Sequence, residues 1–163
     1  MKFFSLRPAE PEHDFGQLAA WFSILEDETT TETGLQTYYE QARARITQQA
    51  AVAENGELLG FWWAARDRLQ PGIVTFFLFV TPEARGQGLG AALYADLERA
   101  MRAAGLAHLR VNVRDDQPAA RAFAERRGFL ERSHALAMAL DLAAFDDRPY
   151  DAIIARLQGE GFF

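Results

Sequence analysis

The strongest constraint in this sequence is a stretch in which an apolar run leads, through closely spaced glycines, into an amphipathic helix. Residues 73–80, IVTFFLFV, show no polar alternation, which predicts a central strand covered on both faces. Glycines stand at positions 86, 88 and 90, and a helical pattern then continues to about residue 104. Such a turn directs free backbone N–H groups and the positive end of a helix dipole at one point. We therefore expect this stretch to bind a phosphorylated molecule.

Helices and strands are predicted on both sides of this unit. Asn55-Gly56 between two apolar runs predicts a hairpin, and Gly105 and Gly128 each predict the end of a helix. The expected elements are strands at 2–7, 49–53, 58–65, 73–80, 109–113 and about 135–142, and helices from Asp14, at 35–46, from about 89, from Pro118 and at about 150–158. This order predicts a mixed-sheet α/β (α+β) fold with helices on both faces.

The composition narrows the class of partner. The chain has 163 residues, a net charge of −6 and a pI near 5.1, which argues against binding to nucleic acid or to an anionic membrane. There are no cysteines, so disulfides and thiolate chemistry are excluded. The first residues are charged too early for a signal peptide, and no apolar run approaches the ~20 residues of a membrane span. We expect a cytoplasmic protein.

Three interpretations of the glycine loop compete. A P-loop requires Lys and Ser or Thr after the glycines, but Ala91-Ala92 stands there. Residues 86–91 do satisfy the dinucleotide pattern G-x-G-x-x-A, and Asp115 follows the next strand. Residues 81–85 nevertheless separate the strand from the first glycine, and a hairpin precedes the unit where a repeated βαβ array is expected. Dinucleotide binding therefore stays an alternative.

The third interpretation rests on a resemblance. The residues Val80-x-Pro82-x-x-Arg85-Gly86-x-Gly88-x-Gly90 resemble the acetyl-CoA signature of the GNAT N-acyltransferase superfamily. Residues 117–129 resemble a later segment of that family, with matches at Ala120, Phe123, Gly128 and Phe129. The order of elements agrees over about residues 2–142. The resemblance implies a GNAT-like acyl-CoA N-acyltransferase fold, with a mixed, mostly antiparallel sheet of six to seven strands.

The same resemblance implies where acetyl-CoA, the co-substrate, is held, and it implies no metal. The strand before the loop is expected to splay from its neighbour and to pair with the pantetheine arm through its exposed backbone. The pyrophosphate is expected on the N–H groups of the loop. Phe123 and Arg126 are expected near the thioester end or the arm. The cofactor-binding residues predicted for the strand and the loop are Leu78, Phe79, Val80, Arg85, Gly86, Gln87, Gly88, Leu89, Gly90 and Ala91.

The groups that would move protons are not evident. The family often has a Tyr in the second motif, where this chain has Ala124, and a carboxylate on the central strand, where Thr75 is the only polar residue. His134, Tyr38 and Tyr39 are catalytic candidates, and each has an alternative interpretation as a packing or surface residue. The acidic residues at 26–28 and 32 are a candidate attraction for a cationic amine, or simply a solvated face.

These observations favour transfer of an acetyl group from acetyl-CoA to an amine of a small molecule or peptide. The alternatives are a degenerate acyl-CoA-binding sensor, suggested by Ala124, and a dinucleotide-binding protein. Residues 1–145 are expected to form the acetyltransferase domain and residues 146–163 a helical extension. The carboxyl-terminal end resembles the join between the halves of tandem GNAT proteins, so we also expect a lone half that forms a homodimer.

Overall fold

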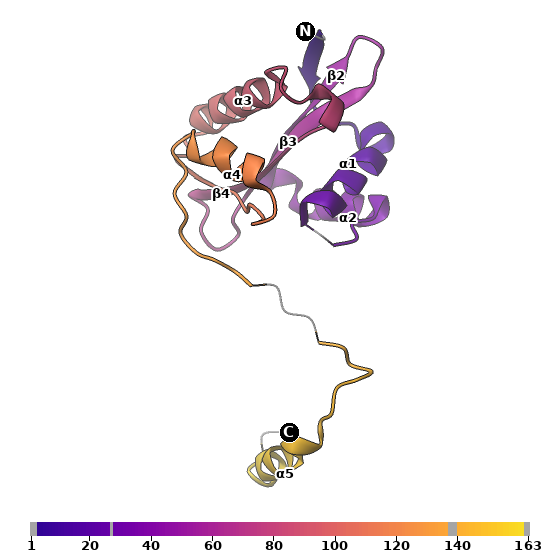
Figure 1. Ribbon diagram of the computed structural model, residues 1–163, viewed down its shortest axis with the longest axis vertical. Coiled ribbons are helices and arrows are strands. Elements are labelled where there is room, and N and C mark those ends of the chain that lie inside the picture. The colour runs from indigo at the N-terminus through magenta and orange to yellow at the C-terminus, as the bar shows by residue number, and fades with distance from the viewer. Residues whose placement is uncertain (1–2, 27, 137–139, 162–163) are drawn as a thin grey trace. The chain divides into compact units, whose positions relative to one another are not determined.

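The computed structural model describes residues 3–26, 28–136 and 140–161, which fall into two units, Met1–Asp116 and Gln117–Phe163. In the first unit a single sheet is covered by helices on both faces (Figure 1). Its elements are β1 (Phe4–Arg7), α1 (Pro11–Glu26), α2 (Glu32–Ala42), η1 (Arg43–Arg45), β2 (Ile46–Ala53), β3 (Leu58–Arg66), β4 (Ile73–Val80), η2 (Pro82–Ala84), α3 (Leu89–Ala103) and β5 (His108–Arg110).

The sheet is mixed, as the sequence predicted, but within the described residues it contains five strands and not six to seven. Their order is β1-β2-β3-β4-β5, with β1 to β4 antiparallel and β5 parallel to β4. The predicted strand at 109–113 is shorter than expected, because β5 ends at Arg110. The Asn55-Gly56 hairpin is confirmed, with Gly56 at a φ of 86° between β2 and β3.

Strand β4 is buried on both faces, as the unbroken apolar run predicted. Phe77 and Phe79 point to α1, where their rings lie 5.0 Å from Phe22 and 4.9 Å from Trp21. Phe76 points to the other face, where its ring centroid lies 6.2 Å from that of Tyr94 on α3. Side chains on the neighbouring strand β3 alternate between the two faces in the same way. The sheet is therefore packed between α1 on one face and α3 on the other.

A buried hydrogen bond fastens α3 to the sheet. Trp62 on β3 is fully buried, and its indole Nε1 donates to the Asp96 carboxylate on α3 at 2.9 Å. Asp96 also forms an ion pair with Arg99 one turn further along α3. An indole N–H without a partner would be costly in this position, so the contact fixes the helix against the strand.

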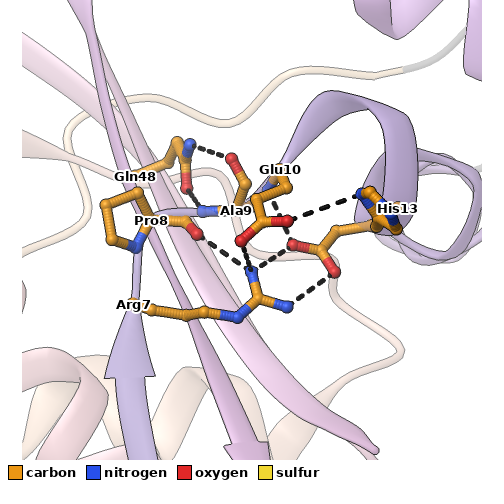
Figure 2. A network of polar contacts seen from close by, with 7 residues as sticks. Arg7, Pro8, Ala9, Glu10, His13 and Gln48 are labelled. Atoms are coloured by element: carbon orange, nitrogen blue, oxygen red, sulfur yellow. Dashed lines mark hydrogen bonds and ion pairs between the residues drawn. The ribbon is translucent and has the colours of Figure 1, made fainter. Parts of the chain in front are cut away.

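The start of α1 is held to the end of β1 by a network of polar contacts (Figure 2). Arg7 donates to both carboxylate oxygens of Asp14, at 2.6 and 3.0 Å, and the N–H of Glu10 donates to the same carboxylate at 2.7 Å. The Gln48 side chain satisfies both backbone groups of Ala9. The prediction that Asp14 begins the helix is therefore wrong. The helix begins at Pro11, and Asp14 lies inside it because Arg7, seven residues away, compensates its buried charge.

The second helix also begins earlier than predicted. Thr31 caps α2 by accepting from the N–H of Gly34 at 3.1 Å, and α2 then ends at Ala42. The short helix η1 follows, and Ile46 already belongs to β2. The predicted span of 35–46 therefore took the first residue of a strand for the end of a helix, because Ile46 fits both patterns.

The second unit contains α4 (Pro118–Glu125), η3 (Arg148–Tyr150) and α5 (Asp151–Gly159). Gly128, at a φ of 83°, ends the turn after α4, and the N–H of Phe129 donates back to Ala124. The strand predicted at 135–142 does not form at residues 135–136 and 140–142, and residues 137–139 lie outside the described residues. Every second residue from 135 to 139 is alanine, which has a low strand propensity and buries little apolar area.

The ion pair between Arg7 and Asp14 generates a prediction about stability. We expect Asp14→Ala to lower the free energy of unfolding by about 2 kcal/mol, because it leaves the half-buried Arg7 without its partner. For a chain of this size that corresponds to a fall in Tm of about 4–8 °C. Glu98→Gln, which breaks the exposed pair with Arg102 on α3, is the control and should change stability by less than about 0.5 kcal/mol.

The same pair predicts a pH dependence. Burial acts to raise the pKa of Asp14, but the hydrogen bonds from Arg7 and from the N–H of Glu10, with the Arg7 charge, outweigh it and hold the pKa below its ordinary value. The stabilisation is therefore complete above the ordinary pKa and is lost as the pH falls through the lowered one. Thermal unfolding from pH 7 to pH 2 should show wild type and Asp14→Ala converging at acid pH. A difference that stayed constant would contradict this assignment.

Candidate functional site

The loop between β4 and α3 adopts a conformation that depends on glycine. Gly86 and Gly88 have φ values of 73° and 86°, in the left-handed region that side chains disfavour. A Cβ built on either residue meets no atom within 4 Å, so the space above the loop is open. Conformation therefore explains the glycines, and the open space leaves room for a ligand to approach the backbone.

Gly88 begins α3 as its N-cap, and it offers no side chain to the helix end. The N–H groups of Leu89, Gly90 and Ala91 are the first three of the helix, and they have no hydrogen-bond acceptor within the helix. The first turn carries no acidic residue. The N–H groups, the helix dipole and the open space together form a place where an anion is stabilised.

Two long side chains of the loop fold back onto its backbone. The Arg85 Nε donates to the carbonyl of Val80 at 3.0 Å, and its guanidinium carbon lies 5.9 Å from the centre of the Phe79 ring. The Gln87 amide donates to the carbonyl of Glu83 at 2.8 Å. These contacts fix the loop relative to the end of β4, and the Arg85 side chain stays exposed beside it.

Strand β4 is paired fully on one side and only at its start on the other. β3 pairs with β4 as far as Val80, whereas β5 pairs with Ile73, Val74 and Thr75 alone. The N–H of Thr81 donates to the carbonyl of Leu59, so the odd-numbered residues of β4 bond to β3 and the even-numbered ones face the other edge. Beyond Thr75 no strand of the described residues covers that edge, on which the backbone of Leu78 and Val80 lies. An extended ligand can pair there as an added strand.

A polar cluster closes the fork where β4 and β5 diverge. Thr75 and Arg110 are the last residues that pair across the two strands. The Arg110 Nε donates to the Thr75 hydroxyl at 3.0 Å, and its Nη2 forms an ion pair with Asp67 at 2.8 Å. Hydrogen bonds from the N–H groups of Leu69 and Gln70, followed by those from Arg110, lower the pKa of Asp67. The sequence singled out Thr75 as polar, but neither Arg110 nor Asp67.

The two predicted tyrosines lie in different surroundings. Tyr39 packs edge-on against Phe15 and Trp63, with ring centroids 5.3 and 5.6 Å apart, and it borders the hydrophobic core. Tyr38 is 45% exposed on the same helix. The position of Tyr39 agrees with the packing alternative, so nothing in its contacts favours a catalytic role.

The acidic segment after α1 is only partly described. Glu26 is exposed as a residue, but protein atoms around its carboxyl group partly exclude water. This desolvation, and then the charge of Glu28, raise the pKa of Glu26. Asp27 lies outside the described residues. The segment closes through Ser23, whose hydroxyl accepts from the N–H of Thr30 at 2.9 Å. This contact holds the start of α2 near the end of α1.

The remaining predicted residues belong to the second unit. Phe123 is half-buried on α4, and Arg127, which the sequence did not indicate, stacks 3.4 Å from the centre of its ring and donates to its carbonyl. Arg126 is exposed just after the helix. His134 is about half exposed, and its Nδ1 lies 3.6 Å from a carboxylate oxygen of Glu131. Ala124 offers no polar group.

An open strand edge that leads through a glycine turn to a helix N-terminus defines a protein that can bind a phosphorylated ligand with an extended arm. Residues 15–129 match the model of the Acetyltransferase (GNAT) family, so the chain belongs to this family. A search of curated protein sequences found no significant match. None of the helices in the described part of the chain is long and apolar enough to cross a membrane.

Solved structures agree in fold. A putative acetyltransferase from Acinetobacter baylyi ADP1 matches with a TM-score of 0.70 at 15% identity, over 80% of this chain and 79% of that one. A GNAT superfamily phosphinothricin acetyltransferase from Sinorhizobium meliloti, in complex with AcCoA, matches with 0.69 at 21%, over 80% and 76%. Glucosamine-6-phosphate N-acetyltransferase from Arabidopsis thaliana matches with 0.63 at 15%, over 86% and 100%. At these identities the likeness concerns the fold alone.

The loop conformation generates a prediction. We expect Gly88→Ala to cost about 1–2 kcal/mol, because alanine resists a positive φ even where its Cβ meets no atom. The Tm should fall by about 2–8 °C. Gly72→Ala is the matched control, because Gly72 also has open space but no positive φ, and it should be neutral or slightly stabilising. Equal melting temperatures for the two variants would show that the loop is not held as described.

Proposed function

We propose that this protein transfers an acetyl group from acetyl-CoA to an amine. The observation that carries the proposal is the open edge of β4, which runs directly into the glycine loop and the start of α3. The family supports acyl transfer in general, and a structure of similar fold was solved with AcCoA. Acetyl-CoA as the donor and an amine as the acceptor are proposed for this chain.

The described residues fit acetyl-CoA by their chemistry. A pyrophosphate is doubly anionic, and the N–H groups from Gly86 to Ala91 offer donors at the start of a helix whose first turn carries no acidic residue, whereas the N–H of Arg85 already donates to the carbonyl of Pro82 at 3.3 Å. The pantetheine arm contains amide groups, which can pair with the backbone of Leu78 and with the N–H of Val80 as a strand would, while the Val80 carbonyl already accepts from Arg85. Phe79 projects between them towards α1, and Phe123 and Arg126 are proposed for the thioester end or the arm.

The chemistry that follows is direct transfer. The amine nitrogen forms a bond to the acyl carbon, the carbon–sulfur bond breaks, and sulfur leaves with the electron pair. The amine gives up a proton to water, and the departing thiolate takes one from water. Water fills these roles in the proposal because Ala124 cannot donate a proton and β4 carries no carboxylate.

The acceptor is proposed to be a small or peptidyl amine. Glu26 and Glu28 place negative charge at the end of α1, on the face of the sheet opposite α3, and this attracts a cationic amine. Nucleic acid, membrane and metal have no part in the proposal. A cytoplasmic location, a domain at 1–145 with a helical extension at 146–163, and a homodimer are proposed with it. Light scattering in solution tests the dimer.

Ala124 favours a second candidate, an acyl-CoA sensor that binds without efficient transfer. It keeps the same site and differs only in turnover. Dinucleotide binding is the third candidate, and the antiparallel order of β1 to β4 argues against it, because a dinucleotide fold expects a parallel array at this point. Ligand titration and turnover together separate the three.

We expect acetyl-CoA at 100 times its Kd to stabilise the protein by about 2.7 kcal/mol, and NAD to leave the Tm unchanged. A panel of amines should then release free thiol from acetyl-CoA in the presence of the protein, with chemically acetylated amine as the matching product. Stabilisation without thiol release would identify the sensor. Stabilisation by NAD and not by acetyl-CoA would overturn both acyl-CoA candidates.

A further inference from the structure

The fork between β4 and β5 ends in a side-chain arrangement that the proposed function does not yet use. Thr75 is the only polar residue of β4, and it lies at the last pair of the two strands. Its hydroxyl accepts a hydrogen bond from Arg110 at 3.0 Å.

The contacts fix the direction in which the Thr75 hydroxyl can act. Because the Arg110 Nε–H donates to Oγ1, the hydroxyl is left to use its own O–H as a donor. Within the described part of the chain Thr75 makes no second side-chain hydrogen bond. Arg110 is itself held by Asp67, whose other carboxylate oxygen accepts from the N–H groups of Leu69 and Gln70. The donor is therefore connected through Arg110 and Asp67 to the backbone N–H groups of Leu69 and Gln70.

The open edge of β4 ends at this donor. From Val80 to Thr75 there are five residues, which at ~3.3 Å per residue span ~16 Å. An arm that starts at the glycine loop and pairs with Val80 and Leu78 runs along this edge, and β5 blocks its further extension at Arg110. The open edge therefore ends beside Thr75, where we expect the reactive end of an extended arm.

We propose that the Thr75 hydroxyl donates a hydrogen bond to the carbonyl oxygen of the acyl thioester, and that Arg110 is the positioning residue that directs it. The inference rests on the proposed acetyl-CoA site. As the amine nitrogen bonds to the acyl carbon, negative charge develops on the carbonyl oxygen, and it returns to the carbon as the carbon–sulfur bond breaks. Thr75 keeps its proton throughout and lowers the barrier by stabilising that charge.

The first test compares turnover and binding. Thr75→Val removes the hydroxyl at nearly constant volume and should lower kcat about 100-fold. The KM for acetyl-CoA, and the Tm shift that acetyl-CoA binding produces, should stay within about twofold of wild type. Thr75→Ser keeps the donor and should retain kcat within about tenfold. Thr47→Val makes the same change at an exposed position of β2 and is the matched control. Wild-type kcat in Thr75→Val would overturn the proposal.

The second test needs no turnover. Acetyl-CoA labelled with 13C at the carbonyl should show a lower carbonyl stretching frequency when bound to wild type than when bound to Thr75→Val. Arg110→Met should move the band towards that of Thr75→Val although the hydroxyl remains, which a merely structural role of Arg110 would not do. Identical bands in all three proteins would refute the donor. A shifted band without any thiol release would keep the donor and refute acyl transfer.

Discussion

The uneven pairing of β4 is the constraint on which the rest of this structure depends. On one side β3 pairs with it to the end, and on the other β5 pairs with its first three residues only. A fully paired strand would leave no backbone group for a ligand, and an unpaired one would not be held in place. Because β5 diverges from β4, the start of β4 is fixed in the sheet, and its later half keeps an edge with hydrogen-bonding groups that β5 does not pair.

The packing on both faces makes this arrangement stable. Phe77 and Phe79 bury one face of β4 under α1, and α3 covers the other, fixed by Trp62 and Asp96. The same α3 supplies the helix N-terminus of the glycine loop. The contact that holds α3 to the sheet therefore also sets the distance between the loop and the open edge, so the core and the candidate site share one support.

Much of the fold follows from local patterns, and the departures have physical causes. The central strand, the hairpin at Asn55-Gly56 and the glycine loop were predicted because each depends on neighbouring residues. Asp14 was misplaced because its partner, Arg7, lies on a strand and not on its own helix. The strand expected at 135–142 needs a distant partner strand, which no local pattern supplies, and its described residues make no ladder.

The sequence by itself determined the loop and the family, because glycine at a positive φ and an unbroken apolar run are properties of single residues and short segments. Only the tertiary structure decided where β5 leaves β4 and that Arg110 reaches Thr75, 35 residues away. The alternation of side chains along each strand is compatible with several registers, and with β5 pairing along part or all of β4. Register and the point of divergence are chosen by packing across the sheet, which no single segment contains.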